Sequence, residues 1–391
     1  MKEVVIVSAV RTPVGSFMGV LSSLSAPKLG AIVIKEAIKR SNITPAMVSE
    51  VIMGCVLPAG LGQAPARQAS IYAGVPDSVP CLTINKMCGS GLKSVMLAVQ
   101  AIQCSDSDIV VAGGMESMSN VPYYLDKARN GYRMGNGRVI DGMILDGLWD
   151  VYNNYHMGNA AELCSRELKI SKAEQDEFAI QSYKKALNAI EKGFFKEEIV
   201  TIEIKGRKEN IIISEDEEPK KVNFDKGLRL KSAFEDNGSV TAFNASKIND
   251  GASALVLMSA EKAEELNINP LARVLGHVSH AQQPEWFTTA PAYAITKVLE
   301  KTGLNKEDID LFEANEAFAV QALSVIKVAG LNPDKVNING GAVALGHPIG
   351  ASGARILTTL LYNMIRGNAK KGIATLCIGG GEASAIILEK I

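Results

Sequence analysis

The chain carries one local pattern twice, once in each half. Residues 89–93 (GSGLK) and 351–355 (ASGAR) each open an apolar helical stretch. Each stretch leads to a strand-like run that ends in adjacent glycines and a glutamate, at residues 112–116 (AGGME) and 378–382 (IGGGE). Two similar halves are expected to pack as a pseudo-twofold pair, and a site between them could draw residues from both.

Strand-like and helix-like stretches alternate in both halves, which favours an α/β fold built from βαβ units. From about residue 120 to 242, glycines, tyrosines and charges are mixed, with a helical stretch at 170–192. Long insertions into compact domains are usually functional, so we expect an inserted loop domain here. The predicted organisation is an N-terminal half (1–119 and 243–270), the loop domain (120–242) and a C-terminal half (271–391).

Composition and charge exclude several classes of partner. The formal net charge of −1 provides no field that would attract nucleic acid or an anionic membrane. The six cysteines form no CxxC pair, and no cysteine or histidine cluster has zinc-ligand spacing. A strand-like run at residues 4–10 leaves no room for a signal peptide, and no apolar run reaches membrane-spanning length. We therefore predict a cytoplasmic protein with reduced cysteines and no metal.

Four residues in or beside small-residue turns could carry chemistry. Cys88 lies just before a predicted helix, whose positive end favours the thiolate. His347 stands between a glycine and a proline, and Asn315 follows an apolar run. Cys377 precedes three glycines, whose N–H groups could hold an oxyanion. Taken singly, these patterns also fit a buried structural cysteine, a solvated turn histidine or a helix-capping asparagine.

Together, the four residues meet the needs of cysteine acyl transfer, which requires a thiolate, a base and oxyanion donors. The whole chain resembles the thiolase family, in its short-chain acetoacetyl-CoA form. The resemblance rests on six motifs in family order, at 85–91 (NKMCGSG), 113–119 (GGMESMS), 156–158 (HMG), 315–318 (NEAF), 346–350 (GHPIG) and 377–381 (CIGGG). It implies a five-layer α-β-α-β-α thiolase fold with an inserted loop domain that binds coenzyme A.

The resemblance also implies roles for these residues. Cys88 resembles the acylated nucleophile, and His347 resembles the base that activates it and later hydrogen-bonds the thioester oxygen. Cys377 resembles the acid/base at the substrate α-carbon. Asn315 resembles the residue that holds a water in a first oxyanion hole with His347, and the N–H groups of Cys88 and Gly379 resemble a second hole. The implied reaction joins two acetyl-CoA into acetoacetyl-CoA and CoA, reversibly and with ping-pong kinetics.

Further positions resemble contacts to coenzyme A or to the acyl group. His156, the short-chain marker of the family, and Met157 would line the pantetheine channel beside Leu148, and Ser246 matches a pantetheine contact. Three basic residues, Lys221, Arg207 and Arg229, could meet the coenzyme phosphates, although each also fits a solvated surface charge. The remaining two expected substrate contacts are aromatic, Phe287 and Phe318.

The chain departs from the family pattern at several points. Residues 286–291 (WFTTAP) replace a Gly-x-Gly-Pro turn, and Phe287 resembles a subgroup that also accepts a 2-methyl branched substrate. That subgroup binds potassium with a tyrosine near an acidic run, but Pro219 stands at the tyrosine position here, so we expect no potassium and no cofactor. Phe243 and Lys247 flank Ser246 where small residues are commoner, and they could narrow or re-aim the pantetheine tunnel.

Other functions are less consistent with these residues. A thiolase for longer acyl chains conflicts with His156, and a condensing enzyme acting on carrier protein conflicts with Cys377. A non-catalytic relative would be expected to lack Cys88, His347 or Cys377, and a dehydrogenase would need a G-x-G-x-x-G after its first strand. The resemblance implies a homotetramer made of two dimers, with acetyl-CoA, acetoacetyl-CoA and CoA as the small-molecule partners.

Overall fold

The computed structural model describes residues 2–206 and 209–391, and its main strands form one mixed sheet path through both halves. In path order they are β14 (Leu311–Ala314), β15 (Lys371–Ile378), β16 (Glu382–Lys390), β13 (Ala272–Ala281), β1 (Val4–Arg11), β12 (Asn249–Ser259), β5 (Ile109–Ser117), β3 (Glu50–Gly54) and β4 (Cys81–Ile84), with β2 (Gly15–Ser16) beside β12. The two half-sheets join where β1 pairs with β13 at Val5–Arg273 and Ile6–Ala272. Because β12 lies between β1 and β5, the chain returns to the first half-sheet after the insertion.

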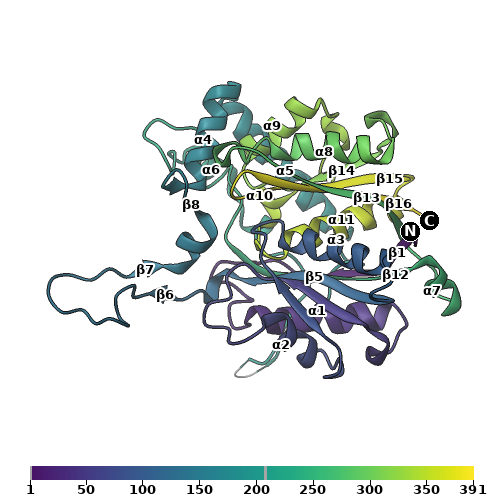
Figure 1. Ribbon diagram of the computed structural model, residues 1–391. Coiled ribbons are helices and arrows are strands. Elements are labelled where there is room, and N and C mark those ends of the chain that lie inside the picture. Colours follow the sequence, from purple (N-terminus) through teal and green to yellow (C-terminus); the bar gives the residue numbers. More distant parts are fainter. Residues whose placement is uncertain (1, 207–208) are drawn as a thin grey trace.

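Helices and half-sheets alternate as five layers (Figure 1). The outer layer of the first half holds α1 (Ala26–Arg40) and α2 (Pro65–Tyr72), and that of the second half holds α8 (Ala290–Thr302) and α9 (Ala319–Ala329). Between the two half-sheets lie α3 (Ser90–Gln103) and α11 (Ser352–Arg366), the helices opened by the repeated pattern. Leu92, Val95 and Val99 of α3 share an apolar core with Leu357 and Leu361 of α11. The α-β-α-β-α prediction is therefore confirmed.

The two repeated glycine pairs serve different purposes. Gly113 and Gly114 do not end their strand, because β5 continues to Ser117. A side-chain carbon on Gly114 would lie 2.0 Å from the carbonyl oxygen of Gly350, so this glycine permits a close approach of the loop that follows His347. In the second half, Gly380 and Gly381 have φ of 92° and 84° and form the turn between β15 and β16.

The segment from 120 to 242 contains short strands and helices. Its elements are β6 (Tyr123–Tyr124), β7 (Ile140–Asp141), a π-helix (Ile144–Leu148), β8 (Trp149–Asp150), β9 (Tyr155–His156), α4 (Met157–Leu168), α5 (Lys172–Glu191), β10 (Ile202–Ile204), β11 (Ile211–Ile213) and α6 (Phe224–Leu228). The arm that carries β6 and β7 projects from the body (Figure 1). The expected helical stretch at 170–192 corresponds to α5, which begins with a capping box between Ser171 and Glu174.

Two further short helices are α7 (Ala260–Glu265), which packs on β1 and β12, and α10 (Ala342–Leu345). The residues 342–345 are fully buried, and they lead directly into the loop that carries His347. Across residues 2–206 and 209–391, no helix is both long enough and apolar enough to cross a bilayer.

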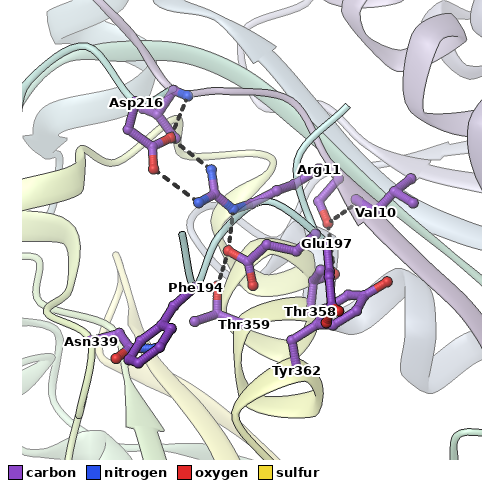
Figure 2. Close-up of polar contacts among 12 residues, drawn as sticks. Val10, Arg11, Phe194, Glu197, Asp216, Asn339, Thr358, Thr359 and Tyr362 are labelled. Carbon is purple, nitrogen blue, oxygen red and sulfur yellow. Dashed lines mark hydrogen bonds and ion pairs between the residues drawn. The ribbon is translucent and has the colours of Figure 1, made fainter. Parts of the chain in front are cut away.

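A buried arginine ties the insertion to the core. Arg11, at the end of β1, is fully buried, and its Nη1 and Nη2 donate to the two carboxylate oxygens of Asp216 at 2.7 and 2.9 Å (Figure 2). Its Nε donates to Glu198 Oε1 at 2.6 Å. Asp216 also accepts from the backbone N–H of Val14 at 2.8 Å. One guanidinium therefore holds two separate stretches of the insertion against the first half.

Replacing Arg11 by methionine should lower the free energy of unfolding by about 3–5 kcal/mol, because the variant leaves two buried carboxylates without their cation. Urea unfolding followed by circular dichroism measures the change. Lys39→Met is the matched control, since the Lys39–Glu36 pair is 3.4 Å long and Lys39 is 75% exposed. Equal stabilities of the two variants would contradict this role of Arg11.

Candidate active site

Cys88 lies on the short connection between β4 and α3. Met87 before it has φ of 45°, and Ser90 Oγ donates to the Met87 carbonyl at 2.7 Å, which fixes the turn. A side-chain carbon on Gly91 would lie 2.8 Å from the backbone nitrogen of Ala354, so the glycine lets α3 meet α11 closely. The Cys88 loop is thereby held against the segment that follows His347.

Two backbone N–H groups face the Cys88 sulfur, that of Gly379 and that of Cys88 itself, and both favour the thiolate. Burial outweighs them and raises the pKa of the Cys88 thiol to about 11. The expected influence of the helix start on the thiolate is thus opposed by desolvation of the partly buried sulfur. The same two N–H groups are those expected to form the second oxyanion hole.

Cys377 is the penultimate residue of β15 and is 1% exposed. Burial, and then the neighbouring Cys88, raise the pKa of its thiol well above the ordinary value. The influence of Cys88 shows that the two sulfurs share one site, although 289 positions separate them in the chain. The structure thus brings together one cysteine from each half.

His347 is buried and is held by two hydrogen bonds, so the alternative of a solvated turn histidine is excluded. Its backbone N–H donates to Asn249 Oδ1 at 2.9 Å, and its Nδ1 lies 2.5 Å from Ser352 Oγ. Because the Ser352 hydroxyl donates to the Pro348 carbonyl at 2.9 Å, it accepts from His347 Nδ1–H. This arrangement assigns the neutral tautomer with a free lone pair on Nε2, the nitrogen that a base needs.

Burial lowers the pKa of His347 to about 3, and the positive charge of Arg355 contributes. With the pKa of Cys88 raised and that of His347 lowered, the resting pair is a neutral thiol and a neutral imidazole.

Asn315 follows β14 and presents its side chain to His347. Its backbone N–H donates to the Thr375 carbonyl at 3.0 Å, and its Nδ2 lies 3.5 Å from His347 Nε2. Asn315 Oδ1 is buried and has no hydrogen-bond partner among residues 2–206 and 209–391. The amide and the imidazole thus lie side by side as polar groups that a thioester oxygen could meet.

Two adjoining hollows are lined by residues next to these groups. One, of about 290 Å³, is lined by His347, Leu148, His156, Ser246 and Phe318, among others. The second, of about 480 Å³, is lined by Met87, Met157, Gly379 and Gly380, among others. Residues 147 and 157 line the second hollow, whereas their chain neighbours 148 and 156 line the first. The two hollows therefore lie on either side of the segments 147–148 and 156–157.

His156 is positioned by local contacts. Its Nδ1 accepts from the Gly158 backbone N–H at 3.1 Å and so caps α4. Its ring stacks on Phe234 at 4.7 Å between centroids, and burial lowers its pKa. The imidazole is therefore a neutral, fixed part of the cavity wall.

The remaining expected contacts lie elsewhere. Lys221 Nζ donates to Glu217 Oε1 at 2.6 Å and to Ser16 Oγ at 2.8 Å, and it lines neither hollow. Phe287 is buried behind Phe318, edge-on at 6.3 Å between centroids, and also lines neither. Arg229 ends α6, and Arg207 lies outside the described residues.

Sequence reasoning missed two residues that orient the site. One is Ser352, which sets the His347 tautomer; its correspondence to Ser90 in the repeat was the available signal. The other is Glu116, whose carboxylate accepts the backbone N–H groups of Val56 and Gly350 at 3.0 and 2.9 Å. Burial raises the pKa of Glu116 to about 7, and the signal was a carboxylate within an apolar strand.

Replacing Ser352 by alanine should lower kcat about 10- to 100-fold with little change in KM, because His347 loses the acceptor that fixes its tautomer. Steady-state thiolysis kinetics measure both constants. Ser70→Ala is the control, since Ser70 is equally buried on α2 and its hydroxyl has no partner in the part of the chain that the structure describes. Equal kcat values for the two variants would contradict the orienting role.

Sequence models of the thiolase N-terminal and C-terminal domains match residues 4–261 and 268–390. The chain is a thiolase. This thiolase is 53% identical over its whole length to the acetyl-CoA acetyltransferase of Schizosaccharomyces pombe, covering 99% of that protein. It is 49% identical to the probable acetyl-CoA acetyltransferase of Escherichia coli, with both chains fully covered. The crystal structure of the Bacillus anthracis acetyl-CoA acetyltransferase, 44% identical, superposes with a TM-score of 0.98 over 100% of this thiolase and 99% of that chain.

Proposed function

We propose that this thiolase is an acetyl-CoA C-acetyltransferase, which joins two acetyl-CoA into acetoacetyl-CoA and CoA and catalyses the reverse thiolysis. The observation that carries the proposal is the full-length identity of about half to relatives named acetyl-CoA acetyltransferase. The site supports it, because carbon–carbon bond formation between thioesters needs a nucleophile, a second acid/base and donors for two oxyanions.

In the first half-reaction the Cys88 sulfur attacks the acetyl carbonyl of acetyl-CoA while His347 Nε2 takes the thiol proton. The N–H groups of Cys88 and Gly379, which face the sulfur, would stabilise the oxyanion of the tetrahedral intermediate. Collapse breaks the bond to the coenzyme sulfur, which takes the proton from His347 and leaves as CoA. The product is acetyl-Cys88 with a neutral imidazole.

In the second half-reaction Cys377 passes its thiol proton to His347 Nε2, and the resulting thiolate removes a proton from the methyl group of a second acetyl-CoA. Asn315 Nδ2 and the now protonated His347 Nε2, which lie 3.5 Å apart, would then donate to the thioester oxygen on which the enolate charge develops. The enolate carbon attacks the acetyl carbonyl, and the bond to Cys88 sulfur breaks. Acetoacetyl-CoA leaves, Cys377 keeps the proton taken from the methyl group, and the Cys88 thiolate takes the proton on His347 Nε2, which restores both thiols and the neutral imidazole.

We also propose that the enzyme is a cytoplasmic homotetramer that uses no metal or other cofactor. Across residues 2–206 and 209–391, no cluster of three or more His, Cys, Asp or Glu side chains could hold a metal ion. Multi-angle light scattering of the purified chain measures the assembly directly, and a monomer would contradict the tetramer.

The deciding experiment is thiolysis of acetoacetyl-CoA, followed by loss of its enolate absorbance, with 2-methylacetoacetyl-CoA and longer 3-ketoacyl-CoA substrates alongside. We expect rapid loss for acetoacetyl-CoA and progressively slower loss as the chain lengthens, since His156 and Phe318 limit a cavity of about 290 Å³. Comparable rates for acetoacetyl-CoA and 2-methylacetoacetyl-CoA would add tolerance of branching. Faster cleavage of longer chains would contradict the short-chain proposal.

A further inference from the structure

A lysine ammonium lies among carbonyl oxygens beside the substrate cavity. Lys247 Nζ donates to the Ala245 carbonyl at 2.7 Å and lies 3.5 Å from the Val343 carbonyl. It also lies 5.8 Å from the centre of the Tyr183 ring. Lys247 and its neighbour Ser246 line the same hollow as His347. Carbonyl oxygens and an aromatic face are the surroundings that a desolvated monovalent cation takes in proteins.

Burial of the Lys247 ammonium costs free energy of solvation, so a charged group kept at this position indicates a functional or structural role. Burial lowers the pKa of Lys247 to about 8, and the carboxylate of Glu218 offsets part of that effect. Lysine side chains usually extend their ammonium into water, yet this one turns back to a carbonyl only two residues before it in the chain. The aromatic neighbours are ordered as well, since Phe243 stacks on Tyr183 at 5.8 Å between centroids.

One of the two carbonyls belongs to the wall of the cavity, and the other belongs to the helix that leads into His347. Ala245 lies in the segment that carries Ser246, whose backbone N–H donates to the Ala317 carbonyl beside Phe318. Val343 lies in α10, which ends at Leu345, two residues before His347. A single ammonium thus connects the segment expected to meet pantetheine with the helix that leads into the base.

We propose that Lys247 is a positioning residue that acts as a covalently tethered monovalent cation, clamping the Ser246 segment to α10 and so shaping the pantetheine end of the cavity. The expected effect of Lys247 on KM for CoA rests on the proposed function, whereas its expected effect on thermal stability in different salts does not. Potassium, which the sequence resemblance associates with a tyrosine, does not fit here. The equivalent residue, Pro219, has no side-chain oxygen, and the Lys247 charge already occupies the carbonyls.

The test compares the parent enzyme with Lys247→Met, Lys247→Ala and the exposed control Lys226→Ala. Thermal midpoints and thiolysis kinetics are measured in potassium chloride and in choline chloride at equal concentration. The parent enzyme should be indifferent to the salt. Both Lys247 variants should raise KM for CoA about tenfold with kcat changed less than about threefold, because the clamp acts on binding rather than on the reacting atoms. Lys226→Ala should match the parent.

Lys247→Ala removes the atoms that propylammonium contains, so propylammonium chloride or potassium chloride should raise its thermal midpoint and lower its KM relative to choline chloride. Failure of both cations to do so would overturn the tethered-cation proposal, as would a parent enzyme stabilised by potassium. Unchanged KM in Lys247→Met, which keeps the aliphatic stem and serves if the alanine variant does not fold, would overturn the positioning role. If no CoA thioester is turned over, the proposed function fails, and the thermal midpoints still test the cation.

Discussion

Replacing Cys88 by alanine should lower the rate of acetoacetyl-CoA thiolysis by about 10⁴-fold or more, because the acyl group then has no covalent acceptor. The N–H groups of Gly379 and residue 88 remain in this variant, so substrate should still bind with a similar dissociation constant. Steady-state kinetics give the rate, isothermal titration gives the affinity, and mass spectrometry of the acetyl-CoA-treated protein should show no added acetyl group.

Cys104→Ser is the matched control, since Cys104 is exposed at the end of α3, the helix that Cys88 precedes. This variant should retain the parent rate and should still gain one acetyl group on a peptide that contains Cys88. An acetyl group found elsewhere in the parent enzyme, or thiolysis by Cys88→Ala at a tenth of the parent rate, would exclude Cys88 as the nucleophile.

Replacing Cys377 by alanine should separate the two half-reactions. Acetylation of Cys88 from acetyl-CoA should continue, because it needs Cys88, His347 and the N–H groups but not a second thiol. Condensation should fall about 10³- to 10⁴-fold, since no group remains to move the α-proton. Exchange of acetyl-CoA methyl protons with deuterated water, measured by NMR, should fall by the same factor.

Cys164→Ala is the control for the loss of a buried sulfur, since Cys164 and Cys377 belong to one apolar cluster. It should cost some stability but preserve proton exchange. Two results would each contradict the assigned role of Cys377: proton exchange that survives in Cys377→Ala, or a loss of Cys88 acetylation as large as the loss of condensation.

The repeated pattern predicted two apolar helices that begin alike, which are α3 and α11, and the pairing of the two halves. Both helices begin with a small residue, a serine and a glycine, and both lie between the half-sheets. The repeat did not predict the difference between the two glutamates that close it. Glu116 is buried and accepts backbone N–H groups, whereas Glu382 is 35% exposed and pairs with Lys86. A local sequence pattern does not show whether the residue at a strand end will be buried against other segments or exposed to solvent.

The helix-dipole argument for Cys88 names only one of two opposing effects, for a similar reason. A residue's place before a helix is readable from sequence, but the free energy of a buried thiolate depends on how much protein covers it. The coverage comes from β15, from the loop after His347 and from residues 56–57, all distant in the chain. Only the folded structure brings them together.

By itself, the sequence determined the alternation of strands and helices, the duplication, and the residue types of a two-cysteine acyl-transfer site. These properties follow from hydrophobic periodicity, small residues at turns and side-chain chemistry, which are local. The tertiary structure alone decided which tautomer His347 adopts, which thiol proton is held tightly, and that Lys247 turns inward to the carbonyls of Ala245 and Val343. Each of these depends on burial and on hydrogen-bond partners far apart in the chain, and such distances exist only after folding.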